Sequence, residues 1–364
     1  MIYKIKPTDT LFFRTGRPFS MGDETWSDTI FPPYSSTFYG ALRTFIIFNR
    51  EGLQAFKEGR YMNDIGSPES KGGMRIYGPF LYKDTTLYFP VPLDLVEVKE
   101  STKRKLLPLE FTDTSEIFIS NYSFEKILVY KGDLDVDEPE GFLDEISLKD
   151  YLLGKTESLY RKEPFEFYKT ELKIGISREK NTLTSKEGYL YRIPLIRLNE
   201  NTSFIIELEN IEDIPKEGLL QLGGEGKVAL LEEVNSDLLD NLKNLKLNLE
   251  NGYFKLYLVT PSIFNNGFLP SWIDKKSLEG EKDGIKVKLV AVAVGKPLKI
   301  GGWDLARQEP KPMYNAVPAG SIYYFRIIGN YPFEKIKESF HFKNISDINP
   351  EEGFGLSLVG KVIV

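Results

Sequence analysis

The segment GFGLSLVGKVIV, residues 353–364, places glycines directly before a run of β-branched residues. Gly355 to Lys361 spells G-x-x-x-x-G-K, which lacks only the final residue of the Walker phosphate loop. That loop needs Ser or Thr after the lysine, and then a helix whose N-terminus faces the phosphates. Val362 stands at that position, and further β-branched residues follow it. The segment therefore indicates a glycine-rich turn into a strand and disfavours a nucleotide-binding loop.

This turn closes a regular pattern in the last third of the chain. Alternating apolar residues predict strands, and apolar residues at helical spacing predict a helix with proline in its first turn. In chain order we expect a strand at 253–264, a short helix or turn at 269–276, strands at 284–296 and 320–328, and a helix at 332–342. With the final strand the order is β-α-β-β-α-β, which is typical of a ferredoxin-like or RRM-like unit.

We interpret the first two-thirds of the chain in the same way. The pattern predicts a strand at 1–14, a helix at 35–52, a hairpin at 73–92, a strand at 201–210, a short helix at 215–221 and a strand at 228–234. A second glycine segment, LGGEGK, precedes the last of these strands. The repeat predicts an α+β protein with two ferredoxin-like (RRM-like) βαββαβ domains and long insertions.

The predicted domains span residues 1–240 and 250–364. The stretch 99–190 is rich in Lys, Glu, Asp and Ser, and we interpret it as an arm or hairpin inserted into the first domain.

Composition limits the chemistry that is open to this chain. It has 364 residues, no cysteine and one histidine, His341, so cysteine-ligated and multi-histidine metal sites are excluded. We expect no metal, no cofactor and no membrane span, and a cytoplasmic location. The net charge of −6 disfavours a general polyanion binder, although a local basic groove is compatible with it. A catalytic role for His341 would need a second proton-transfer group nearby, and a structural role at the end of the helix is favoured.

Two glycine loops are candidate anion sites, because both are expected to offer exposed backbone N–H groups with a lysine nearby. Backbone N–H groups in such loops bind anions, and an RNA backbone is the extended anion expected next to a four-stranded sheet. The alternative is that the glycines only permit a sharp turn into a strand. The first glycine loop, residues 222–227, offers Gly223, Gly224, Gly226 and Lys227, and the second, residues 353–361, offers Gly353, Gly355, Gly360 and Lys361.

Three arginines and a tryptophan are further candidates for RNA binding. Arg14 and Arg17 leave the first strand and form either a phosphate clamp or ion pairs with nearby acidic residues. Arg43 lies off the apolar stripe of its helix and is expected to face solvent or a ligand. Trp303 and Arg307 lie in an aperiodic loop at 300–320, which is interpreted either as a single-stranded RNA site or as a protein-partner surface.

Five ordered segments carry a resemblance to a known family. They are PTDTLFFRTGRPFS, FPPYSSTFYGALRT, IGISREKNTLTSKEGYLYR, GGWDLARQEPKPM and GFGLSLVGK, which together run from residue 7 to residue 361. They resemble the third Cmr subunit of type III-B CRISPR–Cas effector complexes, which belongs to the RAMP superfamily. The resemblance implies a non-catalytic RNA-binding subunit with two ferredoxin-like folds, in which both glycine loops match the glycine-rich loops of the family.

The resemblance also implies partners. A subunit of this kind holds the 5′ tag of the CRISPR RNA, pairs with the large polymerase/cyclase-like Cmr subunit and abuts the first backbone Cmr subunit. The alternative is a metal-independent CRISPR-RNA processing endoribonuclease of the same superfamily. Such nucleases often have a histidine in the first helix, and residues 35–52 contain none.

Overall fold

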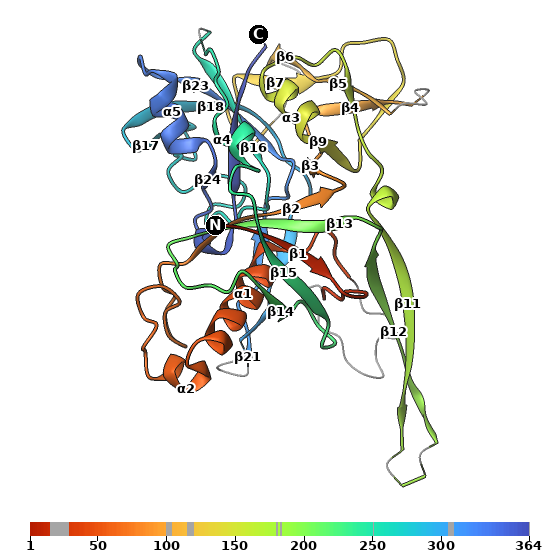
Figure 1. Cartoon of the computed structure of the whole chain (residues 1–364). Helices are drawn as coiled ribbons and strands as arrows, with labels where there is room; N and C mark the ends of the chain where they lie inside the picture. The colour runs from red at the N-terminus through yellow and green to blue at the C-terminus, as the bar shows by residue number, and fades with distance from the viewer. Residues whose placement is uncertain are drawn as a thin grey trace. The chain divides into compact units, whose positions relative to one another are not determined.

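The computed structural model describes residues 1–14, 29–99, 104–114, 120–179, 181–182, 184–249, 251–304 and 309–363. The fold is α+β, mostly sheet with few helices (Figure 1). The chain forms two compact units that are interleaved in sequence. Unit 1 contains residues 1–84, 165–234 and 299–315, and unit 2 contains 85–164, 235–298 and 316–364. The sequence had led us to expect a division near residues 240–250, with residues 99–190 inserted into the first part.

Unit 1 is built on an antiparallel sheet in the order β14-β15-β1-β13-β2. The helix α1 packs on one face of this sheet, where the rings of Phe38 and Phe204 lie 5.0 Å apart. The bounds are β1 Ile2–Pro7, α1 Ser35–Asn49, α2 Gly52–Lys57, β2 Arg75–Lys83, β13 Thr202–Glu209, β14 Glu217–Gln221 and β15 Val228–Val234. The sequence predicted the first helix of this unit and its strands at 1–14, 73–92, 201–210 and 228–234.

The short helix predicted at 215–221 is wrong, because these residues form β14. Residues Glu217 to Gln221 pair with β15, so the backbone bonds of the sheet override the weak helical pattern of this segment. Gly218 lies against α1, where an added Cβ would come within 2.6 Å of the Phe45 ring. The absence of a side chain therefore lets the strand approach the helix closely.

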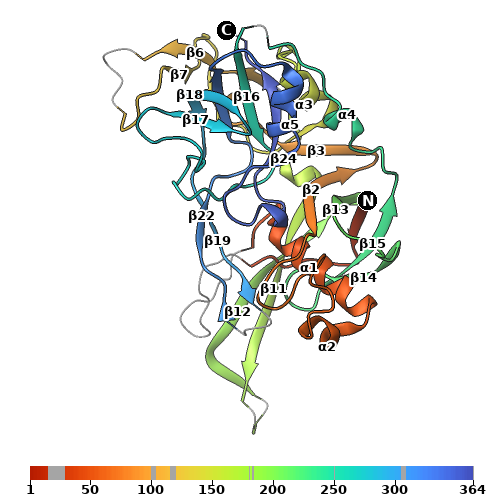
Figure 2. The ribbon, with the colours of Figure 1, turned by 90° about the vertical axis from the view of Figure 1, so that its left-hand side faces the viewer.

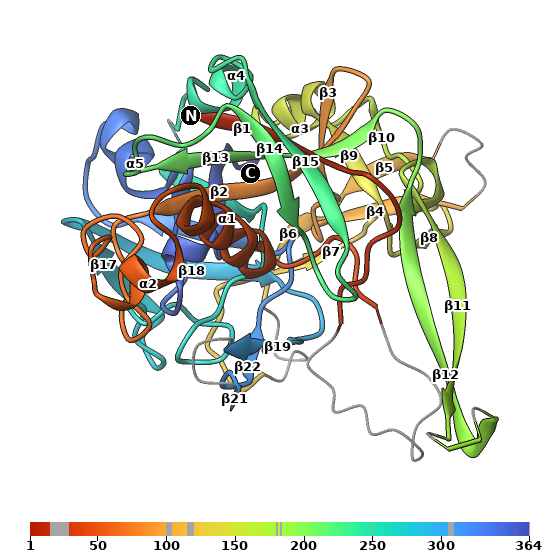
Figure 3. The ribbon, with the colours of Figure 1, turned by 60° about the horizontal axis from the view of Figure 1, so that its bottom comes forward.

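A long two-stranded ribbon also belongs to unit 1. The strands β11 (Tyr168–Arg178) and β12 (Ser185–Leu198) pair antiparallel and extend as the ribbon visible in Figures 1 and 3. The base of the ribbon is joined to the segment after β1 by backbone hydrogen bonds in both directions between Leu11 and Ile196, at 2.7 and 2.8 Å. Residues 299–315 carry the short strands β20 (Trp303–Asp304) and β21 (Glu309–Pro310), flanked by β19 (Leu298–Ile300) and β22 (Tyr314–Ala316).

Unit 2 has a second antiparallel sheet in the order β17-β18-β23-β16-β25-β24. Four of its strands, β16, β17, β18 and β24, are labelled in Figure 2. One face carries an apolar core in which Phe254 and Phe325 stack and Phe340 of α5 packs beside them. The bounds are β16 Tyr253–Leu258, β17 Glu279–Lys282, β18 Ile285–Ala293, β23 Ile322–Ile327, α5 Phe333–Phe340, β24 Lys343–Asn344 and β25 Leu356–Lys361. The principal strands and α5 were predicted, and residues 269–276 are turns and bridges, the second of the two alternatives.

The other face of this sheet is covered by residues 85–164. Tyr257 of β16 donates a hydrogen bond of 2.6 Å to the carbonyl of Pro90, and Tyr324 of β23 packs against Phe111. The covering segment holds β3 Thr86–Pro90, β4 Leu95–Val98, β5 Lys105–Pro108, β6 Glu110–Asp113, β7 Lys126–Val129, β8 Val136–Asp137, β9 Phe142–Asp144, α3 Glu145–Leu152 and β10 Leu159–Tyr160, and α4 (Asp240–Lys243) follows later in the chain. Both faces of the second sheet are therefore buried.

Candidate nucleic-acid interface

The second glycine loop lies inside unit 2. Residues 352–360 are buried, and the N–H of Gly355 donates to the carbonyl of Pro261 at 2.8 Å. The N–H of Leu356 donates to the hydroxyl of Thr260, which itself donates to the carbonyl of Gly353. The expectation of exposed donors is therefore wrong for this loop, because its backbone groups are used within the fold. An RNA-binding role for it stays a prediction.

The glycines of this loop are required by its geometry. Gly355 has a φ of +74°, and a Cβ there would meet the backbone nitrogen of Ser346 at 2.5 Å. Gly360 lies opposite Lys255 in the β16–β25 ladder, and a Cβ would lie about 3 Å from Leu152 and from the Lys255 stem. Gly360 thus makes room for a buried lysine, whereas Lys361 at the end of the strand is exposed.

The first glycine loop is packed at one end and open at the other. Gly223 has a φ of +79°, and both Gly223 and Gly224 lie against Phe12, whose carbonyl accepts the N–H of Gly224 at 2.9 Å. Gly226 has a φ of +64° and is exposed, with no atom within 4 Å of an added Cβ. The expected exposed backbone is therefore found at the tip of this loop.

Lysine 227 connects this loop to the segment that follows β1. Its ammonium donates to the Thr10 hydroxyl at 2.7 Å and lies 3.4 Å from a carboxylate oxygen of Asp9. Arg197 of β12 reaches the other oxygen of Asp9 at 3.1 Å and also pairs with Glu171 of β11. We call this meeting point of residues 8–14, the first glycine loop and the base of the β11–β12 ribbon the loop junction.

Three cations of the loop junction, Lys173, Arg197 and Lys227, already have acidic partners. Lys173 of the ribbon pairs with Glu225 of the glycine loop at 2.8 Å. The pKa of Asp9 is held below its usual value, chiefly by the backbone hydrogen bond from Thr10 and also by Lys227. The pKa of Arg197 is raised, chiefly by its hydrogen bond to Glu171. A phosphate at this place would therefore compete with carboxylates of the chain.

The remaining candidate residues are scattered. Arg14 is exposed and forms a bridge with Thr29, whereas Arg17 and Arg307 lie outside the described residues. Trp303 is 53% exposed and pairs with Pro310.

Arg43 is partly exposed, its guanidinium donates to carbonyls in the loop after α2, and its RNA-binding role stays a prediction. Its partners are the carbonyl oxygens of Ile65 at 3.0 Å, Ser67 at 2.8 Å and Ser70 at 3.3 Å, and it lies over the Phe56 ring.

A sequence model described as "CRISPR-associated protein (Cas_Cmr3)" matches residues 3–362. The chain belongs to the Cas_Cmr3 family. The resemblance found in the sequence is thereby confirmed, and it extends over nearly the whole chain.

Relatives and solved structures agree with this assignment. The chain is 25% identical over 325 residues to the CRISPR system CMR subunit Cmr3 of Saccharolobus solfataricus, which covers 87% of this chain and 84% of the relative. It has a TM-score of 0.53 and 21% identity to a chain of a Type III-B Cmr-beta complex bound to cognate target RNA and AMPPnP, with 93% of each chain covered. A chain from the complex with cognate target RNA gives a TM-score of 0.51, again at 21% identity, with 93% and 94% covered. The structural likeness concerns the fold.

The only histidine of this Cas_Cmr3 chain is buried in unit 2. Its Nε2 lies 2.7 Å from the carbonyl of Leu242, and its Nδ1 accepts the N–H of Val359 at 3.1 Å. These contacts fix the neutral tautomer with the proton on Nε2. Burial lowers the pKa of His341 to about 4. The ring is therefore a structural group, as favoured from the sequence, and both nitrogens are occupied.

The burial of His341 makes the free energy of unfolding depend on pH. The folded pKa of about 4 is below the 6.5 of a free histidine, so the unfolded chain binds the proton first and stability is lost as pH falls from 6.5 to 4. We expect His341 to account for about 3 kcal/mol of this loss. Urea unfolding at pH 7 and pH 4 would measure it by comparison with His341→Gln. An equal loss in both proteins would contradict the expectation.

The described part of the chain has neither a metal-binding cluster nor a membrane-spanning helix. It contains no group of three or more histidine, cysteine or acidic side chains placed to hold a metal ion. None of its helices is both long enough and apolar enough to cross a membrane. Asp9, Thr10 and Arg197 were not predicted as site residues, because an isolated aspartate, threonine or arginine gives no signal until the fold brings these residues together with Lys227.

Proposed function

We propose that this chain is a non-catalytic CRISPR RNA-binding subunit of a type III-B Cmr complex. In this proposal it holds the 5′ tag of the CRISPR RNA and docks the large polymerase/cyclase-like subunit and the first backbone subunit. The observation that carries the proposal is the Cas_Cmr3 match over residues 3–362. The buried, neutral His341 supports a binding role over the nuclease alternative, because it is not available to transfer a proton to RNA.

The strand order supports two ferredoxin-like domains. Numbered along the chain, the four predicted strands of unit 1 lie in the order 4-1-3-2, as β15-β1-β13-β2. The four predicted strands of unit 2 have the same order, as β25-β16-β23-β18. The same antiparallel arrangement thus occurs twice, although each unit has only one of its two predicted helices in the expected place.

The covered sheet face indicates how RNA would be held. RRM-type binding stacks bases on aromatic residues of an open sheet face. In unit 2 the face opposite α5 is covered by residues 85–164, so it does not offer such a platform. We therefore infer that RNA contacts come from loops, with Lys227, Gly226 and Arg14 at the loop junction of unit 1 and the exposed Lys361 at the end of β25 in unit 2.

The direct test compares RNAs with the purified chain. Electrophoretic titration should show tighter binding to an RNA that carries the repeat-derived 5′ tag than to one with a scrambled tag, and no cleavage without metal. Co-purification with the large Cmr subunit tests the docking role separately. Cleavage of the repeat RNA would favour the processing nuclease, and equal affinity for both RNAs would contradict tag binding.

The salt dependence of binding tests the loop junction. We expect the whole chain to neutralise few phosphates, on the order of three to five, because most cations at the junction are paired with carboxylates. Lys227→Ala and Lys361→Ala should each lower the slope of log affinity against log salt by about one. Lys216→Ala is the matched control, since Lys216 is an exposed lysine of unit 1 that pairs with Glu233, away from the junction. A slope unchanged by Lys227→Ala would exclude this residue from the contact.

A further inference from the structure

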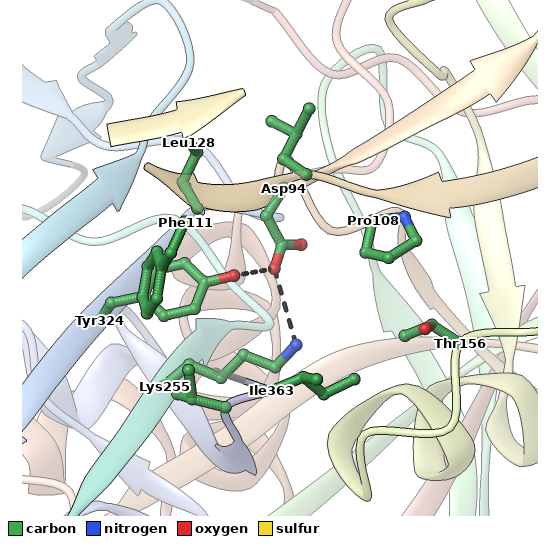
Figure 4. A pocket seen from close by; sticks show the side chains of 10 residues that line it. Asp94, Pro108, Phe111, Leu128, Thr156, Lys255, Tyr324 and Ile363 are labelled. Atoms are coloured by element: carbon green, nitrogen blue, oxygen red, sulfur yellow. Dashed lines mark hydrogen bonds and ion pairs between the residues drawn. The ribbon is translucent and has the colours of Figure 1, made fainter. Parts of the chain in front are cut away.

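Four segments of unit 2 bring polar side chains together in the buried space between the second sheet and its covering segment. Asp94 follows β3, Tyr151 lies on α3, Lys255 on β16 and Tyr324 on β23 (Figure 4 shows Asp94, Lys255 and Tyr324). Asp94 is 1% exposed and Lys255 5% exposed. Charged groups are rarely buried to this degree, and burial of a lysine needs a specific partner.

The carboxylate of Asp94 is fully engaged. The hydroxyl of Tyr151 lies 2.7 Å from each of its two oxygens, and the hydroxyl of Tyr324 also donates to it. The ammonium of Lys255 is held less tightly. It lies 3.6 Å from the nearer carboxylate oxygen, longer than a hydrogen bond, and 3.3 Å above the Tyr151 ring.

A small cavity lies beside this amine. Its volume is ≈ 40 Å³, and its lining includes Lys255, Asp94, Tyr324, Thr156 and Ile363. Ile363 is 59% exposed, so the lining reaches from the buried amine to the protein surface. A space of this size admits a molecule of only a few heavy atoms.

The charge balance of the cluster favours a neutral guest. The Asp94 carboxylate already compensates the Lys255 ammonium, so an added anion would be repelled by Asp94. A small carbonyl compound brings no charge, and its carbon is attacked by amines. We propose that Lys255 is a reactive lysine that condenses with one- or two-carbon aldehydes entering this cavity.

The reaction balances with groups that the site holds. The Lys255 ammonium gives a proton to Asp94, and the free electron pair on Nζ forms a bond to the carbonyl carbon. The carbonyl electron pair moves to oxygen, which takes the proton back from Asp94. Asp94 then carries one proton from the nitrogen of the resulting carbinolamine to its hydroxyl, which leaves as water while the freed nitrogen pair forms the double bond. The sum is one ammonium and one aldehyde giving one protonated imine and one water, with no oxidant or reductant.

The protonation states of Lys255 and of the nearby phenols favour imine formation. Desolvation by burial lowers the pKa of Lys255 to about 8, and the ion pair with Asp94 opposes this shift. Burial first, and Asp94 next, raise the pKa of Tyr151, Tyr257 and Tyr324 well above 10, so the phenols facing the amine stay neutral. A sizeable fraction of Lys255 is therefore a free amine near pH 8, unlike an ordinary exposed lysine.

The test is reductive labelling of the folded chain with glycolaldehyde and cyanoborohydride, followed by peptide mass mapping. At pH 7.5 Lys255 should be modified about tenfold faster than the exposed Lys216, because its larger free-amine fraction outweighs the lower nucleophilicity of a less basic amine. The rate at Lys255 should level off above about pH 8, whereas a free lysine analogue in the same solution continues to rise.

A blocked cavity gives the matched control. Thr156→Phe places a ring in the cavity lining and should abolish labelling of Lys255, whereas Glu157→Phe, one residue outside the lining, should leave it unchanged. Labelling of Lys216 should be the same in both variants and shows equal reagent activity, and circular dichroism shows that both variants remain folded. The proposal is overturned if Lys255 stays unmodified while Lys216 is labelled, or if it reacts only after the chain is unfolded in urea.

Discussion

Replacement of Asp94 with leucine is expected to lower the free energy of unfolding by about 3–5 kcal/mol, because it leaves the Lys255 ammonium buried without its counter-ion. Two buried phenol hydroxyls, those of Tyr151 and Tyr324, would also lose their acceptor. Urea unfolding followed by circular dichroism would measure the loss.

A double substitution separates charge from packing. Asp94→Leu combined with Lys255→Met removes both charges, so most of the loss should be recovered, and the two substitutions should be strongly non-additive. Glu125→Leu is a useful comparison, since Glu125 pairs with Lys288 at 2.9 Å in a partly exposed place and should cost about 1 kcal/mol or less. Equal losses for Asp94→Leu and Glu125→Leu would show that burial of the pair does not matter.

Gly355→Ala is expected to cost about 3 kcal/mol or more, enough to leave little folded protein at elevated temperature. The φ of +74° disfavours any residue with a Cβ, and here the Cβ would also meet the backbone nitrogen of Ser346 at 2.5 Å and the hydroxyl of Ser262 at 2.9 Å. Backbone atoms of a buried turn cannot move aside as the end of a side chain can. Thermal melting and urea titration would show the effect.

Gly226→Ala separates the cost of a positive φ from the cost of a close contact at the added Cβ. Gly226 also has a positive φ, +64°, but an added Cβ meets nothing within 4 Å. Gly226→Ala should therefore lower the free energy of unfolding by only about 1 kcal/mol, which is the penalty of the backbone conformation alone. If both variants melt at the same temperature, the close contact at Gly355 has no energetic weight, and the second glycine loop is less constrained than its geometry indicates.

The strands and long helices were predictable because their signals are local. The alternating residues of 284–296 become β18, and the helical spacing of 332–342 becomes α5. The segment 215–221 was not predictable in this way, because its few apolar residues fit either period and only pairing with β15 decides for a strand. The covering role of 85–164 was equally hidden, since polar composition does not show which buried residues a segment contributes to a distant sheet.

The candidate site was predictable in part. Glycine patterns correctly indicated turns with positive φ, but they do not say whether the turn faces solvent or another backbone, and the two glycine loops differ in that respect. Lys255 had a readable signal that was passed over, because it is a lone lysine inside the apolar strand YFKLYL. A charged residue at the centre of such a strand predicts a buried partner, and only the fold shows that the partner is Asp94.

The position of β1 between two strands from later in the sequence delays its pairing during synthesis of the chain. Tyr3 pairs with Ile206 on one side and with Glu233 on the other, so β1, once synthesised, waits for its partner strands β13 and β15 at residues 202–234. At usual translation speeds the wait is on the order of 10–45 s. During this time Ile2 and Ile5, both buried in the finished sheet, have no partner strands. Nascent chains should therefore depend on chaperones until β15 emerges, and slow codons placed after residue 7 should prolong that exposure.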